Sequence, residues 1–216
     1  MLPTFGEDPG SIQYHIMIKI LFFGRSCKHY LRRFKDRGPE VTFSCDGCGR
    51  ILHKHGRYFR YVACKTQVIQ IPIYRWLCPN CRRTISLLPD FLVPWARYTT
   101  WIREAAIVRK RRGCSWRTIA ENLIHPVISV STTTVKRWWK KYVHKTQAAA
   151  LWLARELILA GEDEDLLRKH ASPVNASKHD TMAWFEQLQK RYTSEETRIR
   201  GYWSYLNARF SDPIWL

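Results

Sequence analysis

Four of the seven cysteines occur in two short pairs, Cys45-Asp-Gly-Cys48 and Cys78-Pro-Asn-Cys81, separated by 29 intervening residues. Each C-x-x-C pair presents two thiolates from one tight turn, and zinc takes four such ligands at the corners of a tetrahedron. The spacing therefore predicts a structural Zn²⁺ site held by Cys45, Cys48, Cys78 and Cys81. Four protein ligands fill the coordination sphere, so we expect no open position for a substrate.

The cysteines and the neighbouring histidines could also serve purposes other than this Cys₄ zinc site. A redox C-x-x-C motif is the main competitor, but it usually occurs singly and at the start of a helix. His53 and His55 could replace cysteine ligands, yet a complete Cys₄ set favours polar positions at a strand edge for both. We expect Cys27, Cys64 and Cys114 to be small buried side chains. Paired cysteines in an unsecreted chain indicate a reducing compartment, so we expect a cytoplasmic, nucleoid-associated protein.

A second group of residues has the pattern of a helix-turn-helix. Segments 115–123 and 131–142 are each amphipathic, and Ser131 is expected to cap the second helix, with Val135 and Trp138 facing the first. The turn between them is longer than usual and contains Pro126, which leaves their crossing angle open. Short hydroxyl side chains at the start of the second helix can approach base edges, and later basic side chains can reach phosphates. The predicted DNA contacts of this helix are Thr132, Thr133, Lys136, Arg137 and Lys140.

A further helix is expected just before this motif. It begins at Thr99 or Thr100, runs to about Arg112 and stops at Gly113, where glycine favours a helix end. Its last turn is strongly basic and is also predicted to face DNA. The residues concerned are Arg109, Lys110, Arg111 and Arg112.

The charge of the chain favours a polyanionic partner. It has 36 Lys and Arg against 18 Asp and Glu, a formal net charge of +18. Residues 1–146 hold 27 basic and eight acidic side chains, whereas residues 147–216 hold nine and ten. A basic region followed by a neutral tail is typical of a nucleic-acid-binding module joined to a packing segment. We therefore expect double-stranded DNA as the partner.

The elements that position these residues predict an α+β fold. We expect a strand over 14–23 and a short basic helix over 26–35, then two hairpin strands at 57–63 and 67–77. Two prolines make 88–94 a connector. The predicted organisation is an N-terminal strand and helix (1–40), a small Cys₄ zinc ribbon built on a β-hairpin (41–94), a helix-turn-helix domain (95–146) and a helical C-terminal segment (147–216).

The C-terminal segment is expected to begin with a separate helix over 147–160, with Ala148, Leu151, Trp152 and Leu159 on its apolar side. This helix would pack on the body of the protein or pair with a second copy, since helix-turn-helix proteins often bind DNA as dimers. A polar linker at 172–177 and two more helices follow, the last opening with the capping box Thr193-x-x-Glu196.

Membrane insertion and catalysis are both disfavoured. The longest apolar runs carry charges and fall short of the roughly 20 residues of a membrane span, and no secretory signal is evident. The acidic run 162–165 lies on one helix end, whereas a two-metal site needs carboxylates that converge from different strands. We therefore expect no membrane association and no enzymatic activity.

The chain resembles a family of bacterial transposon-associated proteins with a zinc ribbon followed by a helix-turn-helix. The resemblance rests on IPIYRWLCPNCRRTISLLPDFLVPWARY (71–98) and on the upstream CDGCGRILHKHGRYFR, and it extends over roughly 14–145. It implies a zinc-containing DNA-binding protein, found beside or derived from insertion-sequence transposases. The protein would be a transcriptional regulator or a truncated or accessory transposase subunit without its own catalytic domain. A transposase is then a candidate partner.

RNA binding by the ribbon is a further alternative. Aromatic side chains on the predicted hairpin could stack bases, although aromatics on strands more often serve cross-strand packing. The residues concerned are Tyr58, Phe59, Tyr61, Tyr74 and Trp76.

Overall fold

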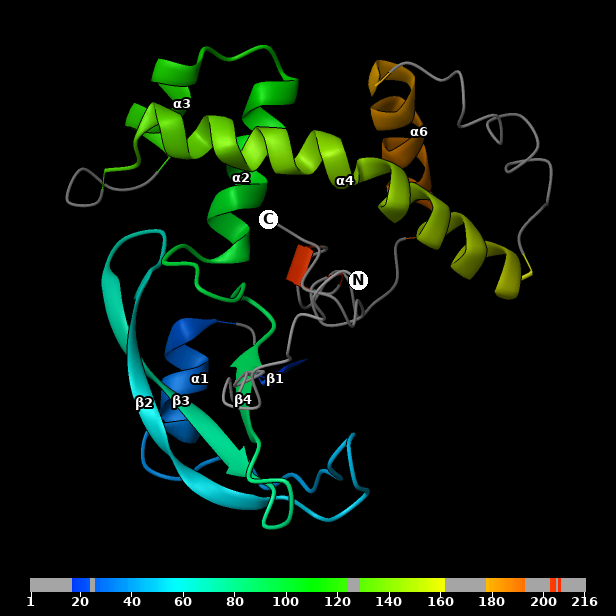
Figure 1. Ribbon diagram of the computed structural model, residues 1–216. Helices are drawn as coiled ribbons and strands as arrows, with labels where there is room; N and C mark the ends of the chain where they lie inside the picture. Colours follow the sequence, from blue (N-terminus) through cyan, green and yellow to red (C-terminus); the bar gives the residue numbers. More distant parts are fainter. Residues whose placement is uncertain are drawn as a thin grey trace, which may run out of the picture.

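A four-stranded mixed sheet with the strand order β1-β4-β3-β2 forms one half of the molecule (Figure 1). The computed structural model describes residues 17–23, 26–123, 129–161, 178–192, 203, 204 and 206. The described structure is mixed α and β, as predicted. The strands are β1 (Met17–Leu21), β2 (His53–Ala63), β3 (Val68–Leu77) and β4 (Thr84–Pro89).

The antiparallel hairpin of β2 and β3 confirms the predicted pair of strands. Its register runs from His53 opposite Leu77 to Ala63 opposite Val68, with a bulge between Lys54 and Gly56. The strand β2 starts four residues earlier than expected. It lies at the edge of the sheet, and along most of its outer side it pairs with no other strand among the described residues.

The strand β4 was not expected from the sequence, which assigned 88–94 to a connector. It pairs antiparallel with β3 and parallel with β1, where Met17 lies opposite Ile85 and Leu21 opposite Pro89. Every residue from Ile85 to Pro89 is buried. A strand covered on both faces loses the alternation of polar and apolar residues by which strands are recognised.

The helix α1 (Cys27–Phe34) matches the predicted basic helix and packs on the hairpin. Ser26 caps it by accepting a hydrogen bond of 3.1 Å from the backbone N–H of His29. The hydroxyl of Tyr30 donates to the Pro72 carbonyl at 2.8 Å, and that of Tyr74 donates to the Phe34 carbonyl at 2.6 Å. These contacts put β1, α1 and the hairpin in one hydrophobic core, across the expected boundary at residue 40.

Close packing also fixes the chain after α1. A side-chain Cβ at Gly38 would lie 2.7 Å from a ring carbon of Tyr74, closer than carbon atoms approach without a shift of the ring. The turn at 38 therefore requires glycine.

In the described part of the chain, the other half of the molecule consists mainly of the helices α2, α3, α4 and α6 (Figure 1). Their shared core contains Ile107, Ile119, Val135 and Leu188, among other residues. Ser115 and Ser131 cap α3 and α4 by accepting from the backbone N–H groups of Thr118 and Thr134. The bounds are α2 (Thr100–Arg111), α3 (Trp116–Asn122), α4 (Thr132–Leu159) and α6 (Lys178–Arg191).

The helix α4 corrects the expectation of two helices separated near residue 146. It runs without a break over 28 residues, and Thr146, inside it, donates a hydrogen bond of 2.6 Å to the Tyr142 carbonyl. Neither proline nor glycine occurs between 132 and 160, so nothing in the covalent chain ends the helix before Gly161.

The apolar face expected for 147–160 is largely wrong, since of its four named residues only Trp152 packs against the helical core. Leu151 is 44% exposed and Leu159 71%, and Ala148 is exposed as well. Because α4 is continuous, its buried stripe carries on from Val135, Trp138 and Tyr142 rather than starting afresh. The buried residues of the second half are Ala149, Ala150, Leu153, Ala154 and Leu157, which share a core with Trp184, Phe185 and Leu188 of α6.

Several sequence expectations lie outside the described residues. They concern the acidic run 162–165, the linker 172–177, the capping box at 193–196 and Pro126. None of the helices in the described part of the chain is both long enough and apolar enough to cross a bilayer.

Candidate metal centre and nucleic-acid interface

The structure brings the four predicted metal ligands together. The Sγ atoms of Cys45, Cys48, Cys78 and Cys81 all lie within 4.8 Å of one another. The first pair precedes β2, and the second lies in the turn between β3 and β4. The antiparallel pairing of β2 with β3 closes the distance between two turns that are far apart in the sequence.

The two turns share one backbone conformation. The N–H of Cys45 donates to the Arg50 carbonyl at 2.8 Å, and the N–H of Cys78 donates to the Arg83 carbonyl at 2.9 Å. In each turn the residue four positions after the first cysteine donates back to that cysteine's carbonyl and has a positive φ. That residue is Gly49 (φ 69°) in the first turn and Arg82 (φ 56°) in the second. The first C-x-x-C turn thus uses the residue type that adopts this conformation at least cost.

The surroundings of the cysteines suit a cation. Cys45 and Cys78 are buried, and the backbone N–H of Cys81 donates to the Cys78 Sγ at 3.3 Å. A backbone hydrogen bond from Arg50 lowers the pKa of Cys48 to about 6, which favours its thiolate. The contact with Cys48 raises the pKa of Cys81 to about 12, because the two sulfur atoms compete for one proton.

The spacing of the sulfur atoms fits a single small metal ion. The Sγ atoms of Cys48 and Cys78 lie 3.5 Å apart. Ligand sulfurs at about 2.3 Å from a tetrahedral metal are separated by about 3.8 Å. His53 and His55 are exposed on β2, and the group of close ligand atoms in the described part of the chain consists of the four cysteines alone.

The remaining cysteines match the sequence expectation only in part. Cys27 is buried, but its Sγ lies 2.6 Å from that of Cys64, which is only half-buried, as is Cys114. The contact with Cys64, together with burial, raises the pKa of Cys27, whereas the contact with Cys27 lowers the pKa of Cys64. Cys27 and Cys64 therefore form a thiol pair between the start of α1 and the end of β2.

The structure places all five predicted contacts of the second helix on the exposed side of α4. They are opposite Val135, Trp138 and Tyr142, which are buried. Ser131 accepts from the Thr134 N–H at 3.1 Å, so the helix begins where the sequence predicted. Residues 132–155 of α4 contain no Asp or Glu, and the first acidic residue, Glu156, lies about seven turns after the start of the helix. The exposed residues are Thr132, Thr133, Lys136, Arg137 and Lys140.

Lys141 and Lys145 extend this basic surface, and the sequence analysis missed both. Partial burial, followed by the positive charges of Arg103, Lys145 and Arg137, lowers the pKa of Lys141. Cations that repel one another in this way create a positive potential that attracts anions. The spacing of the lysines along α4 was the available signal, because both occur in the run from Lys136 to Lys145.

The basic turn at the end of α2 has structural partners instead. Arg109 donates to the Asn122 carbonyl at the end of α3, and Arg111 forms an ion pair with Glu186 of α6. The ammonium of Lys110 donates to the Cys114 carbonyl at 3.2 Å and lies 4.3 Å from the centre of the Trp116 ring. Of the four basic residues, Arg112 is the exposed one. Three of the four thus hold the helices together.

The aromatic residues that could stack RNA bases are divided between core and surface. Trp76 is 1% exposed and Tyr74 8%, and Tyr58 is half-buried. Phe59 and Tyr61, in contrast, are exposed on the edge strand β2. The set of five therefore does not form one stacking surface.

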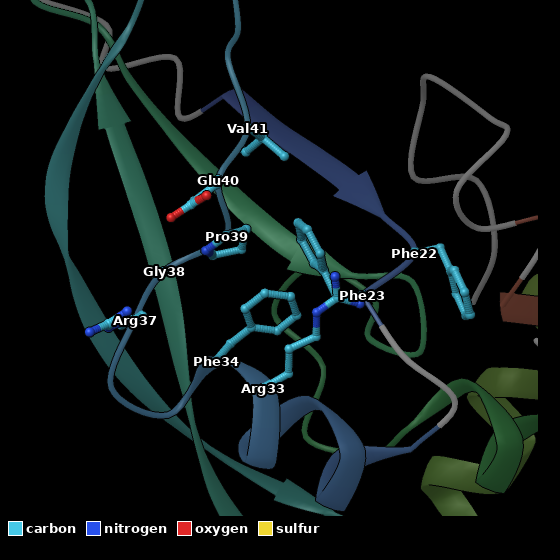
Figure 2. Close-up of a pocket in the computed structure, with 9 residues that line it drawn as sticks. All are labelled: Phe22, Phe23, Arg33, Phe34, Arg37, Gly38, Pro39, Glu40 and Val41. Atoms are coloured by element: carbon cyan, nitrogen blue, oxygen red, sulfur yellow. The ribbon is translucent and has the colours of Figure 1, made fainter.

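A hollow of about 570 Å³ lies beside α1 (Figure 2). Its centre is lined by Phe23, Phe34 and Arg33, and the guanidinium carbon of Arg33 lies 5.2 Å from the centre of the Phe34 ring. Phe22 and Arg37 point away from the centre in opposite directions. The lining includes neither a nucleophile nor a set of metal ligands, so the hollow offers no evident chemistry.

Residues 45–138 match the family model of a domain of unknown function, DUF6431. The match begins at the first cysteine of the metal cluster and ends at Trp138 in α4. It therefore includes both cysteine turns, α2, α3 and the start of α4, while β1, α1 and α6 lie outside it. No curated protein and no solved structure matches the chain.

Proposed function

We propose that this protein is a zinc-containing DNA-binding protein that contacts double-stranded DNA with the first half of α4. The supporting observation is the exposed face of that helix, where two threonines at the N-terminus are followed by basic side chains. Small hydroxyl side chains allow the helix end to approach base edges, and the longer basic side chains reach the phosphates on either side.

The packing of α3 against α4 supports the assignment of a helix-turn-helix. Ile119 of α3 and Leu123, which caps the end of this helix, share a core with Val135 and Trp138 of α4. The rings of Trp116 and Trp139 lie 6.2 Å apart. In this motif the second helix enters the major groove and the first crosses the backbone. The capped, exposed start of α4 supports its proposed role as the second helix of this motif.

The metal centre supports a zinc ribbon next to these helices. Four thiolates in tetrahedral arrangement favour zinc or an iron–sulfur cluster over harder metal ions. We infer zinc, because the two turns converge on a single point and structural Cys₄ zinc sites have this form. The ion would tie the turn before β2 to the turn between β3 and β4 and so stabilise the sheet that carries α2.

The resemblance to transposon-associated proteins suggests the setting of this activity. We propose a regulator or an accessory subunit that directs a transposase to DNA. Selection of bound sequences from a random duplex library separates these roles. Ends of an insertion element would support the accessory role, and a promoter would support regulation.

A charge-matched pair of triple variants tests DNA binding. One replaces Lys136, Arg137 and Lys140 with Ala, and the other replaces the exposed residues Lys28, Arg32 and Lys35 near α1. Both remove three positive charges, so a difference between them reports the position of the charges and not the net charge. Fluorescence anisotropy with a labelled duplex should show at least about tenfold weaker binding for the α4 variant than for the α1 variant. Equal affinities would overturn the proposed role of α4.

A further inference from the structure

Three aromatic side chains are exposed along one edge of the sheet. Phe59 and Tyr61 of β2 are 51% and 65% exposed, and Trp95, in the segment after β4, is 78% exposed. Phe59 and Tyr61 are two residues apart on one strand and therefore project from the same face of the sheet. An exposed cluster of aromatic side chains on a protein with well-packed cores indicates a binding surface.

The backbone holds Trp95 in an unfavourable conformation. Its φ is 62°, in the left-handed region that residues other than glycine seldom adopt. The chain that follows is fixed to β2: the Arg60 guanidinium donates to the Ala96 carbonyl, and the Ala63 N–H donates to the Arg97 carbonyl at 2.8 Å. Residues kept in such conformations cluster at ligand-binding sites, because the surrounding structure must offset the strain. Here the strained residue presents its ring to solvent.

The charges around this edge select an anionic ligand. Residues 47–89 contain eight Lys and Arg and no Asp or Glu. Tyr61 and Trp95 line a surface hollow of about 470 Å³ together with Arg60, Val68, Ala96 and Arg97. Arg97 is exposed there, whereas Arg60 is half-buried and has a pKa lowered by burial. The hollow therefore combines two exposed aromatic rings with an exposed cation.

The segment that carries Trp95 contacts the start of α4. Three residues later, the Tyr98 hydroxyl donates to the Ser129 carbonyl at 3.3 Å, just before the start of α4. The Tyr98 ring also packs against Trp138. These contacts bring the segment that carries Trp95 next to the N-terminal half of α4.

We propose that Tyr61, Trp95 and Arg97 form a stacking surface for unpaired nucleotides of DNA. This inference rests on the proposed duplex binding by α4 and adds a preference for DNA in which a duplex continues into a single strand. Unpaired bases stack on aromatic rings whatever their sequence, and a nearby arginine can contact the phosphates. Phe59, two residues before Tyr61 and thus about 6.8 Å from it along the strand, extends the surface by one ring.

Anisotropy titrations with two labelled DNA molecules test the stacking surface. One is a blunt duplex of about 20 base pairs, and the other is the same duplex with an unpaired oligo-dT tail of about six nucleotides, within the usual site size of such surfaces. The parent protein should bind the tailed DNA about tenfold more tightly than the blunt DNA. Trp95→Ala and Tyr61→Ala should each reduce this ratio towards one and leave the affinity for blunt duplex unchanged. Trp95→Phe, which keeps an aromatic ring, should retain most of the ratio.

The control variant is Leu159→Ala, which truncates an equally exposed apolar side chain at the far end of α4 and should behave as the parent. A parent protein that does not distinguish the two DNA molecules would overturn the stacking surface. So would a Trp95→Ala variant with an unchanged ratio. A tail made of RNA that is preferred over the DNA tail would also contradict the proposal as stated. The proposed function is tested by a different readout. If α4 does not bind duplex DNA, the α4 triple variant keeps its affinity for the blunt duplex, whatever the ratio of affinities for tailed and blunt DNA.

Discussion

The ring of Tyr98 packs edge-on against the ring of Trp138, with their centroids 5.2 Å apart and their planes inclined at 74°. Tyr98 lies between the sheet and α2, and Trp138 lies on the buried side of α4. A second contact between the two halves is the stacked pair of Phe91 and Trp101, 5.3 Å apart. The side of α4 opposite its exposed basic face is therefore anchored to the sheet that holds the cysteine cluster.

Truncation of Tyr98 should weaken this connection. Loss of a fully buried aromatic ring costs about 3–5 kcal/mol, and Tyr98 is half-buried, so Tyr98→Ala should lower the free energy of unfolding by about 2 kcal/mol. Tyr98→Phe keeps the ring and loses only the hydrogen bond to Ser129, so its effect should stay within about 0.5 kcal/mol. Urea titrations followed by circular dichroism measure both. Similar losses in the two variants would mean that the hydroxyl, not the ring contact, matters.

Metal content provides a direct check on the cysteine cluster. The purified chain should contain about one zinc ion, and Cys81→Ser should lose most of it, because three thiolates hold the ion less tightly than four. Elemental analysis by mass spectrometry measures the ratio of metal to protein. Cys114→Ser is the matched control, since Cys114 lies outside the cluster and should retain the full content. Equal zinc in both variants would contradict the assignment of the ligands.

The thiol pair predicts a specific cross-link. Treatment with oxidised glutathione should convert Cys27 and Cys64 to a disulfide, since their Sγ atoms are already 2.6 Å apart. The half-buried Cys64 attacks the glutathione disulfide and releases one glutathione. Cys27 then attacks the mixed disulfide and releases the second, so two protein thiols are oxidised as one disulfide is reduced.

Peptide mapping under non-reducing conditions identifies the linked residues. The oxidised chain should be about 2 Da lighter than the reduced chain, with no change at Cys114. Cys64→Ser should instead leave Cys27 reduced, because Cys27 is buried and cannot reach the reagent. A cross-link that persists in this variant and involves other cysteines would contradict the pairing.

The local signals in the sequence predicted local structure well. Ser131 was predicted to cap its helix, because a hydroxyl before an amphipathic run can accept the free N–H groups of the first turn. Ser26 and Ser115 were predicted as the starts of two other helices, and the structure shows both as caps. The cysteine spacing likewise predicted which sulfur atoms come together, since each C-x-x-C turn is local and a hairpin links the two. The helix boundary at 146 was wrong because no residue there ends a helix, and the division coincided only with the change from a basic to a neutral composition.

Tertiary contacts between distant segments could not be predicted in this way. The pairing of β1 with β4 joins residues far apart in the sequence, and β4 has no alternating pattern to mark it as a strand. The partners of Arg109 and Arg111 lie on α3 and α6, so a run of charges that looked free in the sequence is largely engaged. Exposure of a basic residue depends on such partners, and composition alone does not reveal them.

The continuity of α4 predicts a large effect from one surface substitution. Gln147 is exposed in the middle of the helix, so Gln147→Ala should be neutral or slightly stabilising. Gln147→Pro removes a backbone hydrogen bond and clashes with the preceding turn, at a cost of about 3 kcal/mol. Thermal unfolding of the two variants measures the difference. A proline variant as stable as the alanine variant would indicate that the helix is already interrupted near this position.

Lys140 offers the most specific check on how α4 would contact DNA. Its side chain is exposed two turns after the helix start, where a helix docked by its N-terminus reaches the phosphate backbone and not the bases. Each phosphate contact releases bound counterions, so the logarithm of the binding constant falls with the logarithm of salt concentration by about 0.9 per contact. Lys140→Ala should therefore lower this slope by about one unit and weaken binding to every duplex to a similar degree. Lys28→Ala removes the same charge from the exposed side of α1 and should leave the slope nearly unchanged. Equal slopes for the two variants, measured by anisotropy over a range of salt concentrations, would place the phosphate contacts elsewhere on the protein.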